Sequence, residues 1–345
     1  MDRFLELPPD ERRIYFEQAA AQRGLPVAAL EKDFWVCLTL RELFRLHDIG
    51  EHLTFKGGTS LSKVWGLIER FSEDIDLVID KEVLGFGGDD SPEMAPSKKQ
   101  RRKRGDAMKA ACQEFVHDRI KPALQQSLSP LLDGVGTWVL DGDPDDGDRQ
   151  TLLLTYPGVF PAGETAYLRS VAKIEMGARS DTWPAEERQI QPFLAEVFPE
   201  ALPDAAVTVR AILPERTFWE KATLLHEENQ RPPEKRRNPR LSRHFYDLWA
   251  MIRAGVGERA AAEPDLFARV VTHRQAFFPF SWTDDDTMAR GSLRIVPEQT
   301  LIATWEADYR AMRDAMFSGQ PPEFGEILQV VGAFEKAFNE GQSAG

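Results

Sequence analysis

The sequence predicts a mixed α/β first half followed by a helical second half. Short β-branched segments alternate with helical patterns up to about Leu213, and from Pro214 onward the apolar periodicity is that of helices. The 345 residues are enough for about two domains. We therefore expect an α+β core with a mixed sheet and N-terminal helices over residues 1–213, and a helical domain over residues 214–345.

The first half opens with two helices and then turns to strands. Pro8-Pro9-Asp10 begins an amphipathic stretch that Gly24 ends, and a largely apolar helix is expected from about Val27 to His47. A short strand at Leu53–Phe55 leads into the glycine turn Gly57-Gly58.

A helix is expected after the glycine turn, because Leu61, Val64, Trp65 and Ile68 recur at helical spacing and form one apolar stripe. The next strand, Ser72 to Ile79, alternates in polarity. Further strands are expected at Trp138–Leu140, Thr151–Tyr156, Val171–Met176 and Val207–Leu213.

Two basic stretches stand out in an otherwise acidic chain. Lys98 to Arg104 precedes a helix that runs to about Leu132, and a loop carries Arg231, Lys235, Arg236, Arg237 and Arg240. Each is either a contact for an RNA backbone or a solvated flexible loop. In the helical half, one helix runs from Pro214 to about Asn229, and Ser242 is expected to cap another.

Bulk properties exclude several classes of protein. The net charge of −13 and a pI of about 5.1 mean that the overall field does not attract nucleic acid. Cys37 and Cys112 lack the spacing of a metal site and indicate a reducing compartment. With neither a signal-peptide pattern nor a membrane-length apolar run, the chain is expected to be cytoplasmic.

The glycine turn predicts contact with phosphates. Two glycines let backbone N–H groups approach a ligand, and the start of a helix favours anions. Thr59 and Ser60 add hydroxyl groups there. The alternative is an ordinary strand-to-helix turn, since glycine pairs are common at turns.

Two carboxylates follow the turn at a spacing typical of metal binding. Asp74 and Asp76 project from one face of a strand, where like charges are unfavourable unless a cation lies between them. Two-metal phosphoryl-transfer sites use such carboxylates. The combination with the glycine turn favours a nucleotide site with two Mg²⁺ ions over a solvated strand end.

Such a site usually requires a third carboxylate, and there are two candidates. Glu175 shares a strand face with Lys173, a candidate phosphate ligand, and the alternative is an exposed Lys–Glu pair. Asp247 lies in a helix with Arg243 and His244 one turn before it, so that a local ion pair is its alternative. Lys221, on an apolar helix, is either a triphosphate ligand or a surface lysine.

Two segments, Phe55-Lys56-Gly57-Gly58-Thr59-Ser60-Leu61 and Phe71-Ser72-Glu73-Asp74-Ile75-Asp76-Leu77, resemble the core signature of the AbiEii toxin family. Members are nucleotidyltransferases with a DNA-polymerase-β-like fold, found in abortive-infection (phage-defence) and type IV toxin–antitoxin systems. Shorter stretches are similar at Glu31–Val36, Thr217–Lys221, Arg243–Leu248 and in the tail from Asp308 to Asn339.

The resemblance implies roles for the matching residues. Gly57, Gly58 and Thr59 would contact phosphates, and Asp74 and Asp76 would bind metal. Lys221 would hold the triphosphate and Asp247 would be a distal essential acid. Ser72 matches a serine that some relatives modify when restrained by their antitoxin. Many relatives have an acid where this chain has His244, which leaves the role of Glu175 open.

These observations predict an Mg²⁺-dependent nucleotidyltransferase that acts on an NTP. The resemblance implies tRNA as the acceptor, arrested translation and growth, and a cognate antitoxin as partner. One alternative is a small-molecule acceptor, as in antibiotic adenylyltransferases. Another is a non-catalytic NTP-binding regulatory module. The preferred NTP, the oligomeric state and the existence of an antitoxin do not follow from the sequence.

Overall fold

The computed structural model describes residues 1–70, 72, 74–160, 170–232, 234–235, 237–317 and 320–341. The chain forms two compact units. Unit 1 comprises Met1–Val64 and Phe71–Ala211, and unit 2 comprises Trp65–Arg70 and Ile212–Gly345. The boundary expected near Leu213 lies close to the last of these junctions, whereas no sequence pattern indicated that residues 65–70 belong to unit 2.

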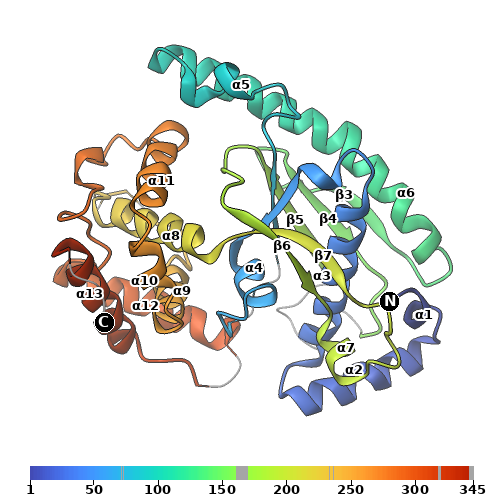
Figure 1. Cartoon of the computed structure of the whole chain (residues 1–345). Helices are drawn as coiled ribbons and strands as arrows, with labels where there is room; N and C mark the ends of the chain where they lie inside the picture. The colour runs from blue at the N-terminus through green and yellow to red at the C-terminus, as the bar shows by residue number, and fades with distance from the viewer. Residues whose placement is uncertain are drawn as a thin grey trace. The chain divides into compact units, whose positions relative to one another are not determined.

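Unit 1 is built on a seven-stranded mixed sheet with the order β3-β4-β5-β2-β1-β7-β6 (Figure 1). The strand β2 is antiparallel to β1 and parallel to β5, and β1 is parallel to β7. The strands are β1 Leu53–Lys56, β2 Ile75–Ile79, β3 Val139–Gly142, β4 Thr151–Thr155, β5 Val171–Gly177, β6 Ala185–Ile190 and β7 Val207–Ile212.

The two faces of the sheet differ in polarity. Along β5, the side chains of Ala172, Ile174 and Met176 are buried, while Lys173 and Glu175 between them are half-buried. The apolar face packs against α3, whose Trp35 stacks on Tyr156 with ring centroids 4.9 Å apart. The polar side chains of β5 therefore lie on the opposite face.

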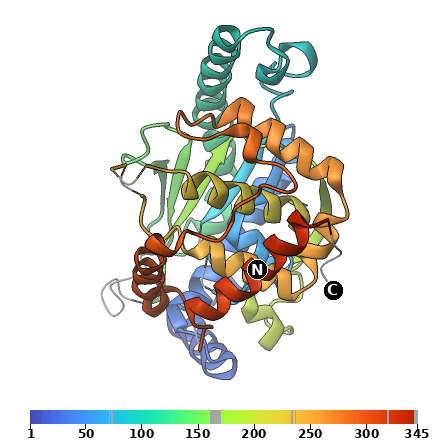
Figure 2. The ribbon, with the colours of Figure 1, turned by 90° about the vertical axis from the view of Figure 1, so that its left-hand side faces the viewer.

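Seven α-helices in the described part of unit 1 surround this sheet: α1 Asp2–Leu5, α2 Pro9–Arg23, α3 Val27–Arg45, α4 Gly57–Lys63, α5 Lys98–Glu114, α6 Lys121–Leu132 and α7 Phe193–Val197. Short 3₁₀ turns lie at Gly50–His52, Gly88–Asp90 and Pro92–Met94. A π-helical turn, Phe115–Ile120, joins α5 to α6, and the three form one long rod whose first turns extend beyond the sheet (Figure 1, Figure 2).

Several elements differ from the expectation. The helix after the glycine turn ends at Lys63, so Trp65 and Ile68 lie outside it. Gly66 follows with φ of +61°, and Trp65 donates its indole N–H to the carbonyl oxygen of Ile212 within unit 2. The strand β2 begins at Ile75 rather than Ser72. The strand β6 was not expected, because its Glu-Glu-Arg-Gln centre is polar and largely exposed.

Unit 2 is helical over its described residues. Its core contains Phe218 and Trp219 of α8, which pack against Phe334 and Phe338. The helices are α8 Pro214–Asn229, α9 Arg243–Arg253, α10 Val256–Ala261, α11 Pro264–Phe277, α12 Gln299–Met316 and α13 Phe324–Asn339, with a 3₁₀ turn at Asp285–Thr287.

Ser242 does precede α9, but its hydroxyl does not cap that helix, because it donates to the Asp308 carboxylate at 2.6 Å. Among the described helices, none combines the length and the apolar character needed to cross a bilayer.

Candidate active site

The glycine turn and an acidic side chain meet in unit 1. Gly57 has φ of +80°, and a Cβ built on it would lie 1.9 Å from Oδ2 of Asp76. The Asp76 carboxylate thus lies directly against the backbone where the turn enters α4. Only glycine tolerates both this backbone angle and this close approach.

The register of the strands places further polar residues of the site beside Asp76. Asp76 pairs with Lys56 of β1 on one side and with Glu175 of β5 on the other, and Glu175 pairs with Thr151 of β4. Directly paired residues project from the same face. The row Lys56, Asp76, Glu175, Thr151 therefore carries one lysine and two carboxylates side by side.

Lys173, next to this row, lies close to several acidic side chains. Its Nζ lies 2.5 Å from Oε1 of Glu175 and 4.0 Å from Oδ2 of Asp143. Partial burial lowers the pKa of Lys173, but the hydrogen bond to Glu175 and the charges of Glu175, Asp74 and Asp143 outweigh burial and raise it. Lys173 is therefore a cation that interacts with three carboxylates, those of Glu175, Asp74 and Asp143.

Thr59 and Ser72 lie at the entry to β2. The Thr59 hydroxyl donates to the carbonyl oxygen of Asp74 at 2.6 Å, and its Oγ1 lies 3.1 Å from Oγ of Ser72. Thr59 therefore fixes the backbone that carries Asp74. Ser60 is also buried, and its hydroxyl has no hydrogen-bond partner among the described residues.

Asp247 and Lys221 lie together in unit 2. The carboxylate of Asp247 accepts two hydrogen bonds from the guanidinium of Arg70, at 2.6 and 2.8 Å, and lies 2.9 Å from Nζ of Lys221. Nζ of Lys221 also lies 3.3 Å from Nδ1 of His244. The ion pairs of Asp247 are thus to residues distant in sequence, and not the local helical pair considered from the sequence.

Burial and charge shape the protonation of this group. Burial raises the pKa of Asp247, but the charges of Arg70 and Lys221 outweigh it and hold the pKa well below its usual range. Burial lowers the pKa of Lys221 and, together with the charge of Lys221, that of His244. His244 is therefore neutral and Asp247 ionised over the physiological range.

The two basic stretches differ in structure. Lys98 to Arg104 form the first two turns of α5, not a flexible loop. In the second stretch, Arg231 and Arg237 both contact Glu228. Arg236 lies outside the described residues.

The residues of unit 1 suit a hard divalent cation chemically. Asp74, Asp76 and Glu175 offer carboxylate oxygens, the ligands that Mg²⁺ prefers. Within the described residues, no three His, Cys, Asp or Glu side chains are grouped as closely as a bound metal ion requires. These residues therefore suit Mg²⁺ because of the chemical type of their oxygen donors and the register that places Asp76 beside Glu175.

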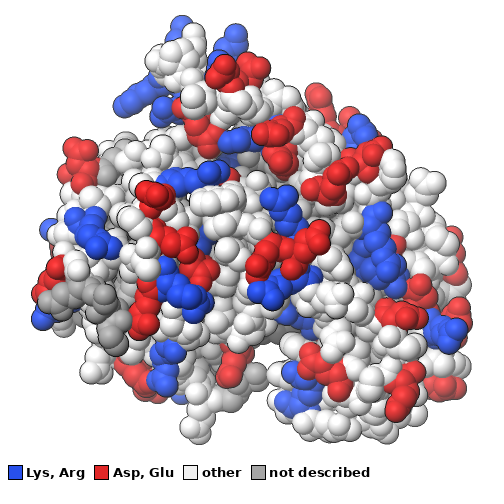
Figure 3. Space-filling view, in the orientation of Figure 1, with Lys and Arg blue, Asp and Glu red and all other residues white. Residues whose placement is uncertain are grey.

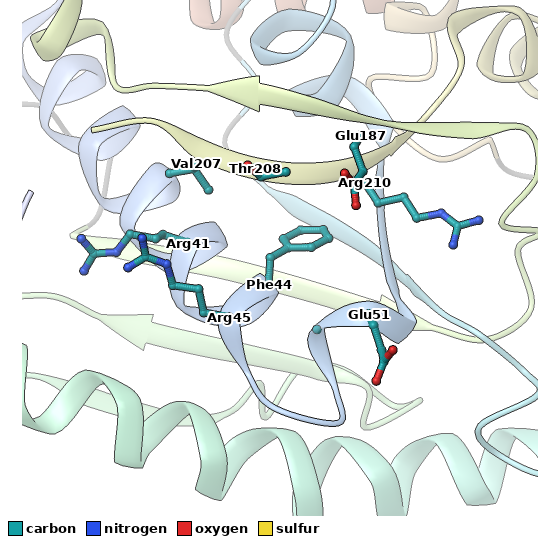
Figure 4. Close-up of a pocket in the computed structure, with 9 residues that line it drawn as sticks. Arg41, Phe44, Arg45, Glu51, Glu187, Val207, Thr208 and Arg210 are labelled. Carbon is teal, nitrogen blue, oxygen red and sulfur yellow. The ribbon is translucent and has the colours of Figure 1, made fainter. Parts of the chain in front are cut away.

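Unit 1 contains a cavity beside the site residues and another away from them. One, of about 340 Å³, includes Asp143 and Thr151 and borders the row of site residues. The other, of about 490 Å³, is lined by none of the predicted residues. Figure 4 shows its Arg41 and Arg45 pointing to one side and its Arg210 to the other, so its cations do not converge on one ligand.

Sequence reasoning missed three residues of these sites. Lys56 was quoted in the motif but given no role, although its position next to the glycine turn was a signal. Asp143 lies in an acidic turn that gave no indication of its partner, and Arg70 carries no local pattern. Their placement depends on pairings between distant segments.

Comparisons with known proteins identify the family of this chain. The sequence profile of the family described as nucleotidyl transferase AbiEii toxin, type IV TA system, matches residues 39–338. A solved structure, MenT4, a nucleotidyltransferase toxin of Mycobacterium tuberculosis, is similar at 19% identity and a TM-score of 0.43 over 93% of this chain and 98% of that one. No curated protein matches the chain. Because the family profile covers more than half of its length, the chain belongs to the AbiEii family of nucleotidyltransferase toxins of type IV toxin–antitoxin systems.

Proposed function

We propose that this protein transfers a nucleotide from an NTP to an acceptor hydroxyl, at a Mg²⁺-dependent site formed by Asp74, Asp76 and Glu175. The observation that carries the proposal is the seating of Asp76 against Gly57, with Glu175 beside it in strand register. Asp76 and Glu175 thus project from the same face of the sheet, and Asp76 adjoins the glycine turn.

Each group has a definable task in this reaction. The acceptor oxygen forms a bond to the α-phosphorus, its proton passes to a neighbouring carboxylate, and pyrophosphate leaves. Asp74 and Asp76 would hold two Mg²⁺ ions, and these ions would supply positive charge for the triphosphate and the leaving group. Gly57, Gly58 and Ser60 present backbone and hydroxyl donors to phosphate, and Lys173 adds positive charge.

We assign the third carboxylate to Glu175 rather than Asp247. Glu175 is half-exposed and adjoins Asp76, whereas Asp247 is fully buried and neutralised by Arg70 and Lys221. A carboxylate that receives a proton must be accessible to the acceptor. The phosphate-binding role of Lys221 stays a prediction from the resemblance.

The acceptor that we propose is tRNA, and the consequence is arrested translation and growth, relieved by a cognate antitoxin. The support is membership of a toxin family of type IV toxin–antitoxin systems. Ser72 is half-buried at the entry to β2, so its modification would change the segment that carries Asp74. A small-molecule acceptor is an outcome that the following experiment separates.

The test is label transfer from each of the four α-³²P-NTPs to purified tRNA. Asp74→Ala and Asp76→Ala are expected to abolish transfer, and Glu175→Gln to lower kcat by about 100-fold or more, because it removes a catalytic carboxylate. The matched control is Glu187→Gln, which removes an exposed carboxylate of β6 in the same sheet.

The outcomes separate the alternatives. Full transfer by Asp74→Ala would defeat the proposal. If the Glu175→Gln variant is active and the Asp247→Asn variant is inactive with unchanged stability, Asp247 and not Glu175 is the third catalytic carboxylate. If tRNA stays unlabelled while small molecules of an added cell extract are labelled, the acceptor is a small molecule and not tRNA.

A further inference from the structure

We propose that the first two turns of α5 dock the phosphate backbone of the RNA acceptor. This α5 basic strip consists of Lys98, Lys99, Arg101, Arg102, Lys103 and Arg104. The inference rests on the proposed function, and it names the surface through which a protein of net charge −13 holds a polyanion. Figure 3 shows Lys and Arg side chains gathered at the top, over the projecting end of α5.

Four of the six cations of the strip are exposed and weakly paired, whereas Arg101 and Arg104 are half-buried and Arg104 donates to the backbone carbonyls of Asp89 and Ser91. Lys98, Lys99, Arg102 and Lys103 are exposed. Arg102 lies 4.0 Å from Asp106, a solvent-exposed pair that contributes little. No carboxylate among the described residues forms an ion pair with Lys98, Lys99 or Lys103. These cations are therefore available to an external anion.

The strip is also unfavourable for the helix that carries it. The N-terminus of a helix bears a partial positive charge, which disfavours lysine in the first turn. Lys98 and Lys99 occupy that turn, and four more cations follow. Residues that oppose local stability are expected at functional sites. Folding of α5 does not explain this composition, whereas an anionic partner does.

The course of α5 connects the strip to the candidate site within unit 1. Lys109 of α5 lies 2.5 Å from Asp148, and Cys112 lies in hydrogen-bond range of the backbone of Ala178, next to the end of β5. The loop containing Asp148 also carries Asp143, the partner of Lys173. At 1.5 Å per residue, Lys98 lies about 16 Å along the axis from Lys109. The helix α5 therefore leads from the end of β5 outward to the strip.

The composition of the strip favours RNA over other anionic partners. Apart from Gln100, every residue from Lys98 to Arg104 is a cation. Protein interfaces depend on aromatic or apolar anchors, and membrane-surface helices on an apolar face, and the strip offers neither. Repeated point charges and guanidinium groups suit successive phosphates.

The other basic stretch does not share these properties. Glu228 contacts both Arg231 and Arg237, and Lys235 lies 4.1 Å from the ring centre of Trp282. Two acidic residues, Asp284 and Asp286, follow that tryptophan. This loop therefore supplies a control variant that removes surface cations away from the strip.

The experiment measures RNA binding separately from catalysis. Binding of fluorescent tRNA is followed by anisotropy from 50 to 300 mM salt, in an Asp74→Ala background that prevents modification. The variant K98Q/K99Q/R102Q/K103Q is expected to weaken binding about 10- to 100-fold and to reduce the slope of log K against log salt by about one per residue removed. The control K235Q/R240Q is expected to change neither.

Catalysis in the Asp74-containing protein gives a second measurement. The strip variant is expected to raise the KM for tRNA about 10- to 100-fold, with kcat at saturating tRNA and the KM for NTP unchanged. An unchanged salt slope for the strip variant would overturn the inference. The inference would also fail if the strip variant bound RNA normally but was no longer neutralised by an antitoxin, or no longer bound anionic vesicles. If wild type labels no RNA, the proposed acceptor fails, while the binding assay still decides whether the strip holds RNA.

Discussion

At the residue scale, the glycine turn creates space for a carboxylate. Asp76 occupies the position where a side chain on Gly57 would begin. The close approach places a carboxylate oxygen next to the backbone at the start of α4. The glycine is therefore required by the geometry of the site, and not only by the turn.

Gly57→Ala is expected to abolish transfer activity, because the new Cβ would force the Asp76 carboxylate away from the turn. The positive φ adds strain of about 1–3 kcal/mol. The measurement is label transfer together with the urea midpoint. Gly24→Ala is the control, since Gly24 has φ of +65° and nothing lies within 4 Å of an added Cβ. An active Gly57→Ala protein would show that Asp76 does not need its present position.

The ion-pair partners of Asp247 could not be predicted from its local sequence. The helical pattern placed it one turn after Arg243, yet its partners are Arg70 and Lys221. A fully buried carboxylate with two cations is costly to disturb, because removal of one partner leaves an unpaired charge. An inactive Asp247 variant therefore needs a stability measurement before a catalytic role is assigned.

At the element scale, short apolar and β-branched segments predicted strands that are buried on one face. Val171–Gly177 and Val207–Ile212 alternate clearly, and both were expected. The edge strand β6 lacks this pattern because much of it faces solvent. The choice between Glu175 and Asp247 was open for another reason: it depends on the register between β2 and β5, which local sequence does not encode.

One buried histidine links α8 to a distant loop. The fully buried His226 accepts the backbone N–H of Arg294 at Nδ1, at 2.9 Å, and its Nε2 lies 3.0 Å from Oγ1 of Thr287. Burial, and then the charge of Arg294, lower the pKa of His226 to about 4, although Asp284 opposes the shift. Protonation at Nδ1 would remove the acceptor that holds this loop.

The stability of unit 2 is therefore expected to fall at acidic pH. Between about pH 6.5 and pH 4 the unfolded chain binds a proton that folded His226 does not, so stability is lost as pH falls through this window, by about 3 kcal/mol. His226→Asn keeps an acceptor for Arg294 but cannot titrate. Urea unfolding at pH 7 and pH 4.5 should show a larger loss for wild type, and equal losses would contradict the assignment.

At the scale of the whole molecule, the chain passes between its two units three times. Residues 65–70 leave unit 1 after α4 and return to it before β2. Hydrogen bonds from Trp65, Glu69 and Arg70 hold this segment within unit 2. The Trp65 indole donates to the carbonyl oxygen of Ile212, and the Glu69 backbone N–H donates to the Tyr246 hydroxyl. The Arg70 guanidinium donates to the Asp247 carboxylate. A short segment from the first half of the sequence is thus part of the helical unit.

We therefore expect the helical unit to be unstable as a separate fragment. A fragment of residues 212–345 would lack Arg70, so that Asp247 would keep only Lys221 as a partner. The loss of one partner of a buried ion pair costs about 3–5 kcal/mol. This is a large part of the roughly 5–15 kcal/mol that stabilises a domain. We expect fragment 212–345 to unfold at much lower urea than the same fragment with residues 65–70 attached through a flexible linker, as followed by circular dichroism. The attached segment with Arg70→Ala should lose most of the gain, because the gain comes from the pairing with Asp247. Equal midpoints for all three fragments would show that Asp247 tolerates the loss of Arg70, and that unit 2 needs nothing from the first half of the chain.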